Sequence, residues 1–285
     1  MPDKLRLVSL MAENMDVFYA SLAHWLARAC GVLVEVEDSV RWQEREQMLD
    51  RGEAHVGFLC GLPYVWRADR NVPLVKLLAA PVMRGRRYFG KPVYFSDVVV
   101  RVDSPFHSFA DLRGRSWAYN EPHSHSGYNL ARYQLALLGE RRGYFKHVVE
   151  TGTHQSSLRM VAGGTIDGSA IDSTVFELER RLRPELAASV RVIATFGPSP
   201  IPPAVVSARL PIGLRRRLRE RLLAMHRDRL GRQILEWAGI ARFAAVSDSA
   251  YNPIRHMARV ADGVRLGPIS TDSRLGPRAV GRRSL

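Results

Sequence analysis

The chain has 285 residues, of which 46% are hydrophobic, and a formal net charge of +14 at pH 7. A chain of this length can bury one large core or two modest ones, and two lobes are the expected arrangement. Most of the positive charge comes from arginines that are scattered along the chain among leucines and acidic residues. This pattern indicates solvated helix faces and argues against a nucleic-acid-binding protein.

The two cysteines, Cys30 and Cys60, have no metal-type spacing and make no disulfide framework, so they are buried thiols or one bridge. No apolar run is long enough to span a bilayer, which predicts a soluble protein. Residues 5–10 are apolar but too short for the core of a signal peptide, and they run directly into the polar segment 13–16. We interpret them as part of the fold, which leaves the compartment open between export and the cytoplasm.

Short β-rich runs alternate with amphipathic helical stretches, and this alternation predicts mainly parallel sheets with crossover helices. In the first half, apolar residues recur at helical spacing from Met15 to Ala29, and Gly31 follows where a helix is expected to end. The first series consists of strands at 5–10, 32–36 and 55–59 and helices at 15–29 and 41–50.

A long β-branched run at 94–102 is suited to carry the chain from one lobe to the other. The second series has strands at 116–119, 145–150, 169–171, 190–196 and 204–207, helices at 127–138, 156–162 and 174–182, and further helices from 213 to about 260. We therefore expect a first lobe at 1–95, a second lobe at 96–190 and a return to the first at 191–264. Residues 265–285 are rich in Gly, Pro, Ser and Arg and are expected to form a disordered tail.

The most informative segment is 121–128, EPHSHSGY, which lies between a predicted strand and a helix expected to begin near Ser126. A helix start offers unpaired backbone N–H groups and the positive end of the helix dipole, which together favour an anion. Ser124, His125 and Ser126 can add side-chain donors. The simpler interpretation is that Ser124 or Ser126 only caps the helix.

Two further strand-to-helix junctions repeat this pattern. At 151–157, Thr153 can cap a helix and His154 would project from its start. At 171–174, Asp172 follows the carboxyl end of a strand, where open α/β sheets place their ligands. A carboxylate beside an oxyanion favours a ligand that carries a proton, such as a protonated phosphoryl group, over sulfate.

Metal and catalytic patterns are sparse. His123 and His125 form a His-x-His pair near Glu121, but no further ligand cluster accompanies them, and we assign no metal or other cofactor. The chain has no Gly-x-Ser-x-Gly elbow, no Walker loop, no His-Glu-x-x-His motif and no Rossmann fingerprint after the first strand. The sequence therefore predicts a binding protein and not an enzyme.

With these segments in view, the chain resembles the phosphate, phosphite and phosphonate-binding family of ABC-importer substrate-binding proteins. The resemblance extends from residue 5 to about 260, and the order of its motifs is more specific than any one of them. The similar segments are GLPY at 61–64, YFS at 94–96, FADLRG at 109–114, SHSGY at 124–128, GTH at 152–154, IDS at 171–173 and NPIR at 252–255.

The resemblance implies a two-lobed, type II periplasmic-binding-protein-like α/β fold, an importer's membrane subunits as partner if the chain is exported, and a monomer in the periplasm. It implies a small phosphoryl oxyanion as ligand: a phosphonate, phosphite or phosphate ester. The implied ligand-binding residues are Tyr64, Tyr94, Ser124, His125, Ser126, His154 and Asp172, with Asp172 accepting from a protonated oxygen.

Two departures from the family pattern affect the expected ligand. His125 stands where a small hydroxyl residue is usual, which implies an affinity that depends on pH near neutrality. Pro202-Pro203-Ala204 stands where aminoalkylphosphonate binders carry an aspartate, which argues against the usual aminophosphonate. Three alternatives remain: a cytoplasmic ligand sensor, an enzyme on the same fold, similar to the thiamin-precursor synthases, and association with nucleic acid or a membrane through the arginines.

Overall fold

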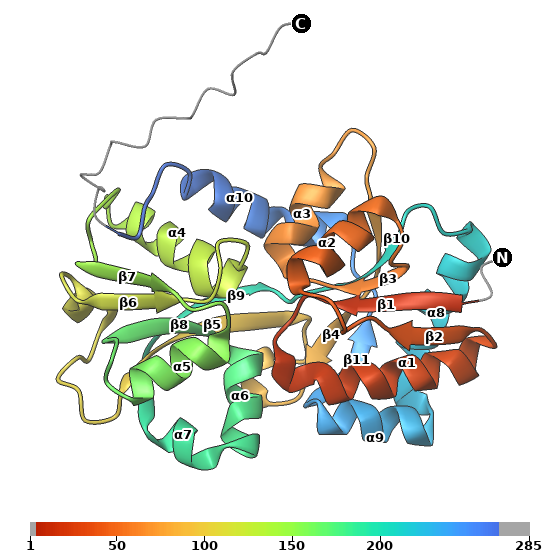
Figure 1. The fold of residues 1–285 in the computed structure, drawn as a ribbon, viewed down its shortest axis with the longest axis horizontal. Coiled ribbons are helices and arrows are strands. Elements are labelled where there is room, and N and C mark those ends of the chain that lie inside the picture. The colour runs from red at the N-terminus through yellow and green to blue at the C-terminus, as the bar shows by residue number, and fades with distance from the viewer. Residues whose placement is uncertain (1–3, 268–285) are drawn as a thin grey trace, which may run out of the picture.

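The computed structural model describes residues 4–267, which form two lobes side by side (Figure 1). Lobe I is built on a six-stranded sheet in the order β11-β4-β10-β3-β1-β2, and lobe II on a five-stranded sheet in the order β7-β6-β8-β5-β9. The strands of lobe I are β1 (Lys4–Ser9), β2 (Leu33–Val36), β3 (Val56–Phe58), β4 (Val75–Met83), β10 (Ala204–Ser207) and β11 (Ile240–Ala244). Those of lobe II are β5 (Val93–Arg101), β6 (Ser116–Tyr119), β7 (His147–Glu150), β8 (Gly168–Asp172) and β9 (Val190–Pro200).

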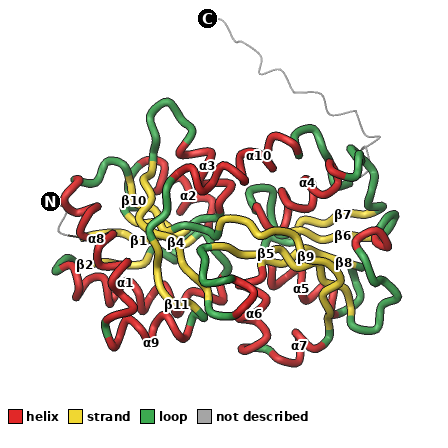
Figure 2. The backbone as a smooth tube through the Cα atoms, turned by 180° about the vertical axis from the view of Figure 1, so that it is seen from behind, coloured by secondary structure: helices red, strands yellow, loops and turns green. Residues whose placement is uncertain are grey.

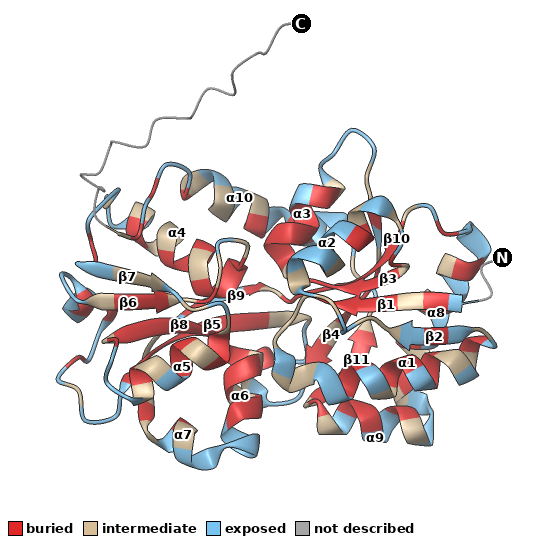
Figure 3. Ribbon diagram, in the orientation of Figure 1, coloured by how far each residue is buried: buried red, intermediate tan, exposed pale blue. Residues whose placement is uncertain are grey.

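Helices cover both sheets, and burial is concentrated in the strands and on the helix faces turned toward them (Figure 3). In α1, Phe18, Leu22 and Leu26 are buried at helical spacing, and the helix ends at Gly31 because φ there is +64°, in the left-handed region. The helices of lobe I are α1 (Asp16–Cys30), α2 (Trp42–Arg51), α3 (Gly61–Ala68), α8 (Ile212–Ala224) and α9 (Arg229–Trp237). Those of lobe II are α4 (Leu130–Leu137), α5 (His154–Ala162), α6 (Ser173–Leu182) and α7 (Pro184–Ala188).

Two connections join the lobes. The chain enters lobe II from β4 into β5 and returns from β9 into β10, and β5 and β9 pair antiparallel along their length (Figure 2). This arrangement confirms the expected two-lobed α/β fold. The sheets are mixed where the sequence indicated mainly parallel ones, because β5, β10 and β11 all pair antiparallel with their neighbours.

Three sequence expectations for single segments need comment. The expectation of helices throughout 213–260 is wrong at Ile240–Ala244, which forms β11 against β4. This five-residue segment, IARFA, follows Gly239, at φ +70°, and periodicity alone does not distinguish so short a strand from a helix. The helix expected from Gly127 begins two residues earlier, as a π-helical turn at His125–Asn129 that leads into α4. The tail expected at 265–285 lies almost wholly outside the described residues.

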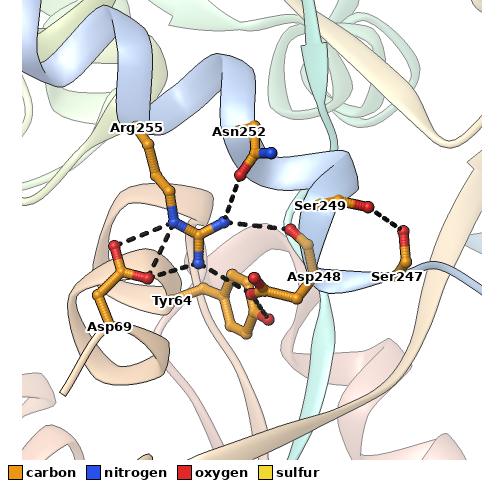
Figure 4. Close-up of polar contacts among 7 residues, drawn as sticks. All are labelled: Tyr64, Asp69, Ser247, Asp248, Ser249, Asn252 and Arg255. Carbon is orange, nitrogen blue, oxygen red and sulfur yellow. Dashed lines mark hydrogen bonds and ion pairs between the residues drawn. The ribbon is translucent and has the colours of Figure 1, made fainter. Parts of the chain in front are cut away.

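The last helix, α10 (Asn252–Val260), contacts both lobes, packing on α3 and on α4 (Figure 1). At its first turn, Arg255 pairs with Asp69 after α3 at 2.6 Å and with Asp248 at 2.9 Å (Figure 4). At its other end, Arg132 of α4 donates to the carbonyl of Ala261 at 2.7 Å. Polar contacts therefore tie α10 to both lobes. Within residues 4–267, no helix combines the length and hydropathy needed to cross a membrane.

Candidate ligand-binding cleft

A polar cavity of about 100 Å³ lies where the two lobes meet. Lobe I contributes the loop after β1 and the first turns of α2, and lobe II contributes the turns that follow β6, β7 and β8. The polar and charged residues of its wall include Glu13, Arg45, Asn120, Glu121, Ser124, Ser126, Thr153, His154 and Asp172. Four of the residues expected from the sequence are thus brought together: Ser124, Ser126, His154 and Asp172.

The π-helical turn after β6 shapes the first side of this cavity. Ser124 caps the turn, and its hydroxyl accepts from the Gly127 N–H at 3.0 Å. The Ser126 hydroxyl lies 3.2 Å from Nε2 of His154 at the start of α5. Gly127 leaves room for the Asn120 side chain, since a Cβ at this position would lie 2.0 Å from the Asn120 amide oxygen and would displace it. Both serines therefore belong to the cavity wall, and Ser124 is also the cap of the turn.

Burial controls the charge of His154 and Asp172. His154 is 7% exposed, and burial lowers its pKa to about 4, so the imidazole is neutral at neutral pH. Its Nδ1 is buried and has no hydrogen-bond partner among the described residues. Asp172 caps α6 by accepting from the N–H of Thr174 at 2.8 Å, and burial raises its pKa to about 6. Asp172 can therefore change protonation when a ligand arrives.

Tyr94 lies behind this wall. It is fully buried, and burial raises its pKa well above the usual value, with the Cys60 thiol and the Asp172 carboxylate adding to the effect. Its hydroxyl has no hydrogen-bond partner among the described residues. Tyr94 is not among the residues that line the cavity, so it supports the wall and does not face a ligand directly. The neighbouring Cys60 lines the cavity as a free thiol, as Cys30 is free in lobe I.

His125 occupies a different place from the one expected. Its Nδ1 accepts from the Asn129 amide at 3.2 Å, so the proton resides on Nε2, which donates to the Ser199 hydroxyl at 3.2 Å. The ring is fully buried and does not line the cavity. Burial lowers its pKa to about 3, so its titration lies far below neutrality. The expected pH sensitivity near neutrality therefore does not come from His125, which instead joins the π-helical turn to β9.

Tyr64 also lies away from the cavity. Its hydroxyl donates to Asp248 at 2.6 Å (Figure 4), and this carboxylate and burial raise the pKa of Tyr64. The residue borders an open groove of about 640 Å³ on lobe I, between α3 and α8. This groove is larger than the cavity between the lobes, but lobe II contributes nothing to it.

Sequence reasoning missed several residues of the cleft. Trp42 and Arg45 line it from α2, and their i, i+3 spacing is a signal that they share a helix face. Arg45 makes no ion pair among the described residues, and its Nε is buried without a partner. Glu121 lines the other side, and burial raises its pKa to about 7. The cleft thus holds one unpaired cation beside carboxyl groups that titrate near neutrality.

Contacts between the lobes close this region. The ring of His123, from lobe II, lies between Trp42 and Trp66 of lobe I, with ring centroids 5.8 and 5.1 Å apart. The Glu46 carboxylate is 3.5 Å from its Nδ1 and raises the pKa of His123. On the other side of the cavity, the Asn14 amide donates to Glu179 at 3.0 Å.

Two hinged lobes with a polar cavity between them define a solute-binding protein. A family model for the periplasmic substrate-binding proteins of phosphonate ABC transporters matches residues 9–251. The chain belongs to this family of transporter binding proteins.

Solved structures show the same fold at low sequence identity. The binding protein component of an ABC phosphonate transporter from Pseudomonas aeruginosa is 18% identical, with a TM-score of 0.80 over 90% of this chain and 86% of that one. PhnD1 of Prochlorococcus marinus, in complex with methylphosphonate, is 17% identical, with a TM-score of 0.81 over 93% and 100%. A Xanthomonas citri protein bound to ATP is 18% identical, with a TM-score of 0.71 over 91% and 97%.

Proposed function

We propose that this protein captures a small phosphoryl oxyanion, a phosphonate, phosphite or phosphate ester, between its lobes for delivery to the membrane subunits of an ABC importer. The observation that carries the proposal is a cavity built by both lobes, whose wall includes His154 with a buried Nδ1 that has no hydrogen-bond partner among the described residues. In keeping with the family, we place this activity in the periplasm.

Each group has a defined role toward the ligand. Ser124 and Ser126 donate hydroxyl hydrogen bonds to phosphoryl oxygens, and Tyr94, on the crossover strand β5, supports this wall from behind. His154 is neutral, so it acts through a hydrogen bond and not through charge. Arg45 supplies the positive charge. Asp172 accepts a hydrogen bond from a protonated phosphoryl oxygen and discriminates against sulfate, which carries no such proton.

Binding couples to closure of the lobes, and no covalent bond is made or broken. The ligand bridges α2 of lobe I and the turns of lobe II, so it stabilises the closed arrangement that the importer recognises. The contacts of His123 with Trp42, Trp66 and Glu46 form only when the lobes approach, and they add to this stabilisation.

A ligand panel tests the proposal. Phosphate, phosphite, methylphosphonate, 2-aminoethylphosphonate and sulfate are compared by thermal shift and calorimetry, and recovered ligand is checked by mass spectrometry. A ligand at 100 times its Kd should stabilise the folded state by about 2.7 kcal/mol. We expect phosphoryl compounds to raise the melting temperature, sulfate to have little effect, and the ligand to be recovered unchanged.

Ser126→Ala should weaken phosphoryl binding, because it removes a donor from the cavity. Ser169→Ala is the matched control: Ser169 is equally buried in lobe II, on β8, but does not line the cavity. A flat response to every phosphoryl compound, or equal losses in the two variants, would overturn the proposed function.

A further inference from the structure

A second, smaller cavity of about 50 Å³ adjoins the polar one. It lies beneath the loop after β1, against the start of α6, and its walls come mainly from the buried aromatic and aliphatic side chains of lobe I. Its apolar lining includes Phe18, Phe58, Met83, Ile240 and Phe243.

The two cavities have three wall residues in common: Met11, Ala12 and Val175. Met11 and Ala12 belong to the loop after β1 in lobe I, and Val175 belongs to α6 in lobe II. The apolar cavity is therefore a neighbour of the polar cavity, and the residues between them come from both lobes. A ligand whose head is held by the polar wall can place a substituent toward this second space.

The lining of the second cavity suits an uncharged substituent. None of the residues that line it carries a charge, and its side-chain hydroxyls belong to Tyr19 and Thr174. The Thr174 hydroxyl already donates to Asp172 at 2.7 Å. An ammonium group placed here would lose water without gaining a carboxylate partner, whereas an alkyl group would lose only unfavourable contact with water.

We propose that the ligand is a phosphonate with a short apolar substituent, whose phosphoryl head occupies the polar cavity and whose alkyl chain occupies the cavity lined by Phe18, Phe58 and Phe243. This inference rests on the proposed function of the polar cavity and adds the class of substituent. The second cavity sets the size limit: a cavity of about 150 Å³ accepts benzene, so one a third as large accepts two or three carbons.

A series of ligands on the unmodified protein gives the first test. Calorimetry compares methyl-, ethyl-, propyl- and 2-aminoethylphosphonate at one pH. Burial of each added methylene should tighten binding roughly 4-fold, and therefore roughly 15-fold from methyl to propyl. We expect 2-aminoethylphosphonate to bind more weakly than propylphosphonate, although the two chains have similar length.

Two variants provide the second test. Ala238 lines the apolar cavity but not the polar one, so Ala238→Val should remove the gain for propylphosphonate and leave methylphosphonate binding unchanged. Ala187→Val is the matched control, since Ala187 is a similarly buried alanine on α7 of lobe II. Met83→Ala enlarges the cavity and should extend the gain to butylphosphonate.

The outcomes separate the two proposals. If methylphosphonate binds but longer alkyl chains bind no tighter, or if the aminoethyl compound binds best, the apolar substituent is refuted and the proposed function stands. If no phosphoryl compound binds, the proposed function itself fails. Equal effects of Ala238→Val and Ala187→Val on propylphosphonate would also count against the second cavity.

Discussion

Asp172→Asn should stabilise the ligand-free protein at neutral pH. Burial raises the pKa of this carboxyl from 3.8 to about 6, so the folded state disfavours its charged form. Asparagine is uncharged and is an equally good helix cap, so the bond from the Thr174 N–H is retained. The substitution therefore removes a charge that the folded protein keeps at a cost.

The size and sign of the effect follow from the shift in pKa. A difference of about 2 units corresponds to about 3 kcal/mol, since each unit contributes 1.36 kcal/mol. Because the folded-state pKa is raised, the cost of the charge is absent below pH 3.8, grows between pH 3.8 and about 6, and is constant above that. The stability difference between variant and wild type should be largest at pH 7–8 and should fall below ~1 kcal/mol at pH 4.

Urea unfolding at several pH values between 4 and 8, without ligand, measures this difference. A second measurement addresses selectivity: sulfate should bind more tightly to Asp172→Asn than to the wild type, because the repulsive carboxylate is gone. A stability difference that does not change with pH, or that has the opposite sign, would refute the electrostatic reasoning, and unchanged sulfate affinity would refute the assigned selectivity.

Three further results are expected. Arg45→Gln should weaken phosphoryl binding about tenfold or more in calorimetry. The melting temperature should change little, because the Arg45 guanidinium makes no ion pair among the described residues. Unchanged affinity would contradict the role of Arg45. The pKa of His123 is raised, so its charged contact with Glu46 across the lobes is complete below about pH 6.5 and is lost as the pH rises. Small-angle scattering should therefore show that the lobes of the wild type open as the pH rises. A His123→Phe variant that opens identically would refute this contact. Gly127→Ala should abolish binding, because the added Cβ would lie 2.0 Å from the Asn120 amide oxygen, whereas Gly213→Ala, which points into open space, should bind normally.

Much of the cleft was predictable because its elements form locally. The caps at Ser124, Thr153 and Asp172 each accept from a backbone N–H two or three residues ahead, so the residue type and its place after a strand were sufficient signals. These turns follow strands β6, β7 and β8, and β6 pairs parallel with the other two, so their convergence also followed from the parallel sheets expected for an α/β fold.

The misplaced side chains depend on contacts between distant segments. His125 turns away from the cavity because a π-helical turn, and not a regular helix start, sets its direction, and because Asn129 and Ser199 hold both ring nitrogens. Tyr64 faces Asp248, which is 184 residues away in the sequence. Neither partner could be identified from local periodicity.

The sequence by itself determined the two-lobed class, the order of most strands and helices and the position of the hydroxyl-rich turns, because these follow from hydrophobic periodicity and short-range hydrogen bonds. Only the tertiary structure decided which side chains share the cleft. Arg45 and Trp42 reach it from the opposite lobe, and burial lowers the pKa of His154 and is the largest cause of the raised pKa of Asp172. The reason is that packing across the junction of two lobes combines segments far apart in the chain, and the dielectric environment that shifts a pKa exists only after they have packed.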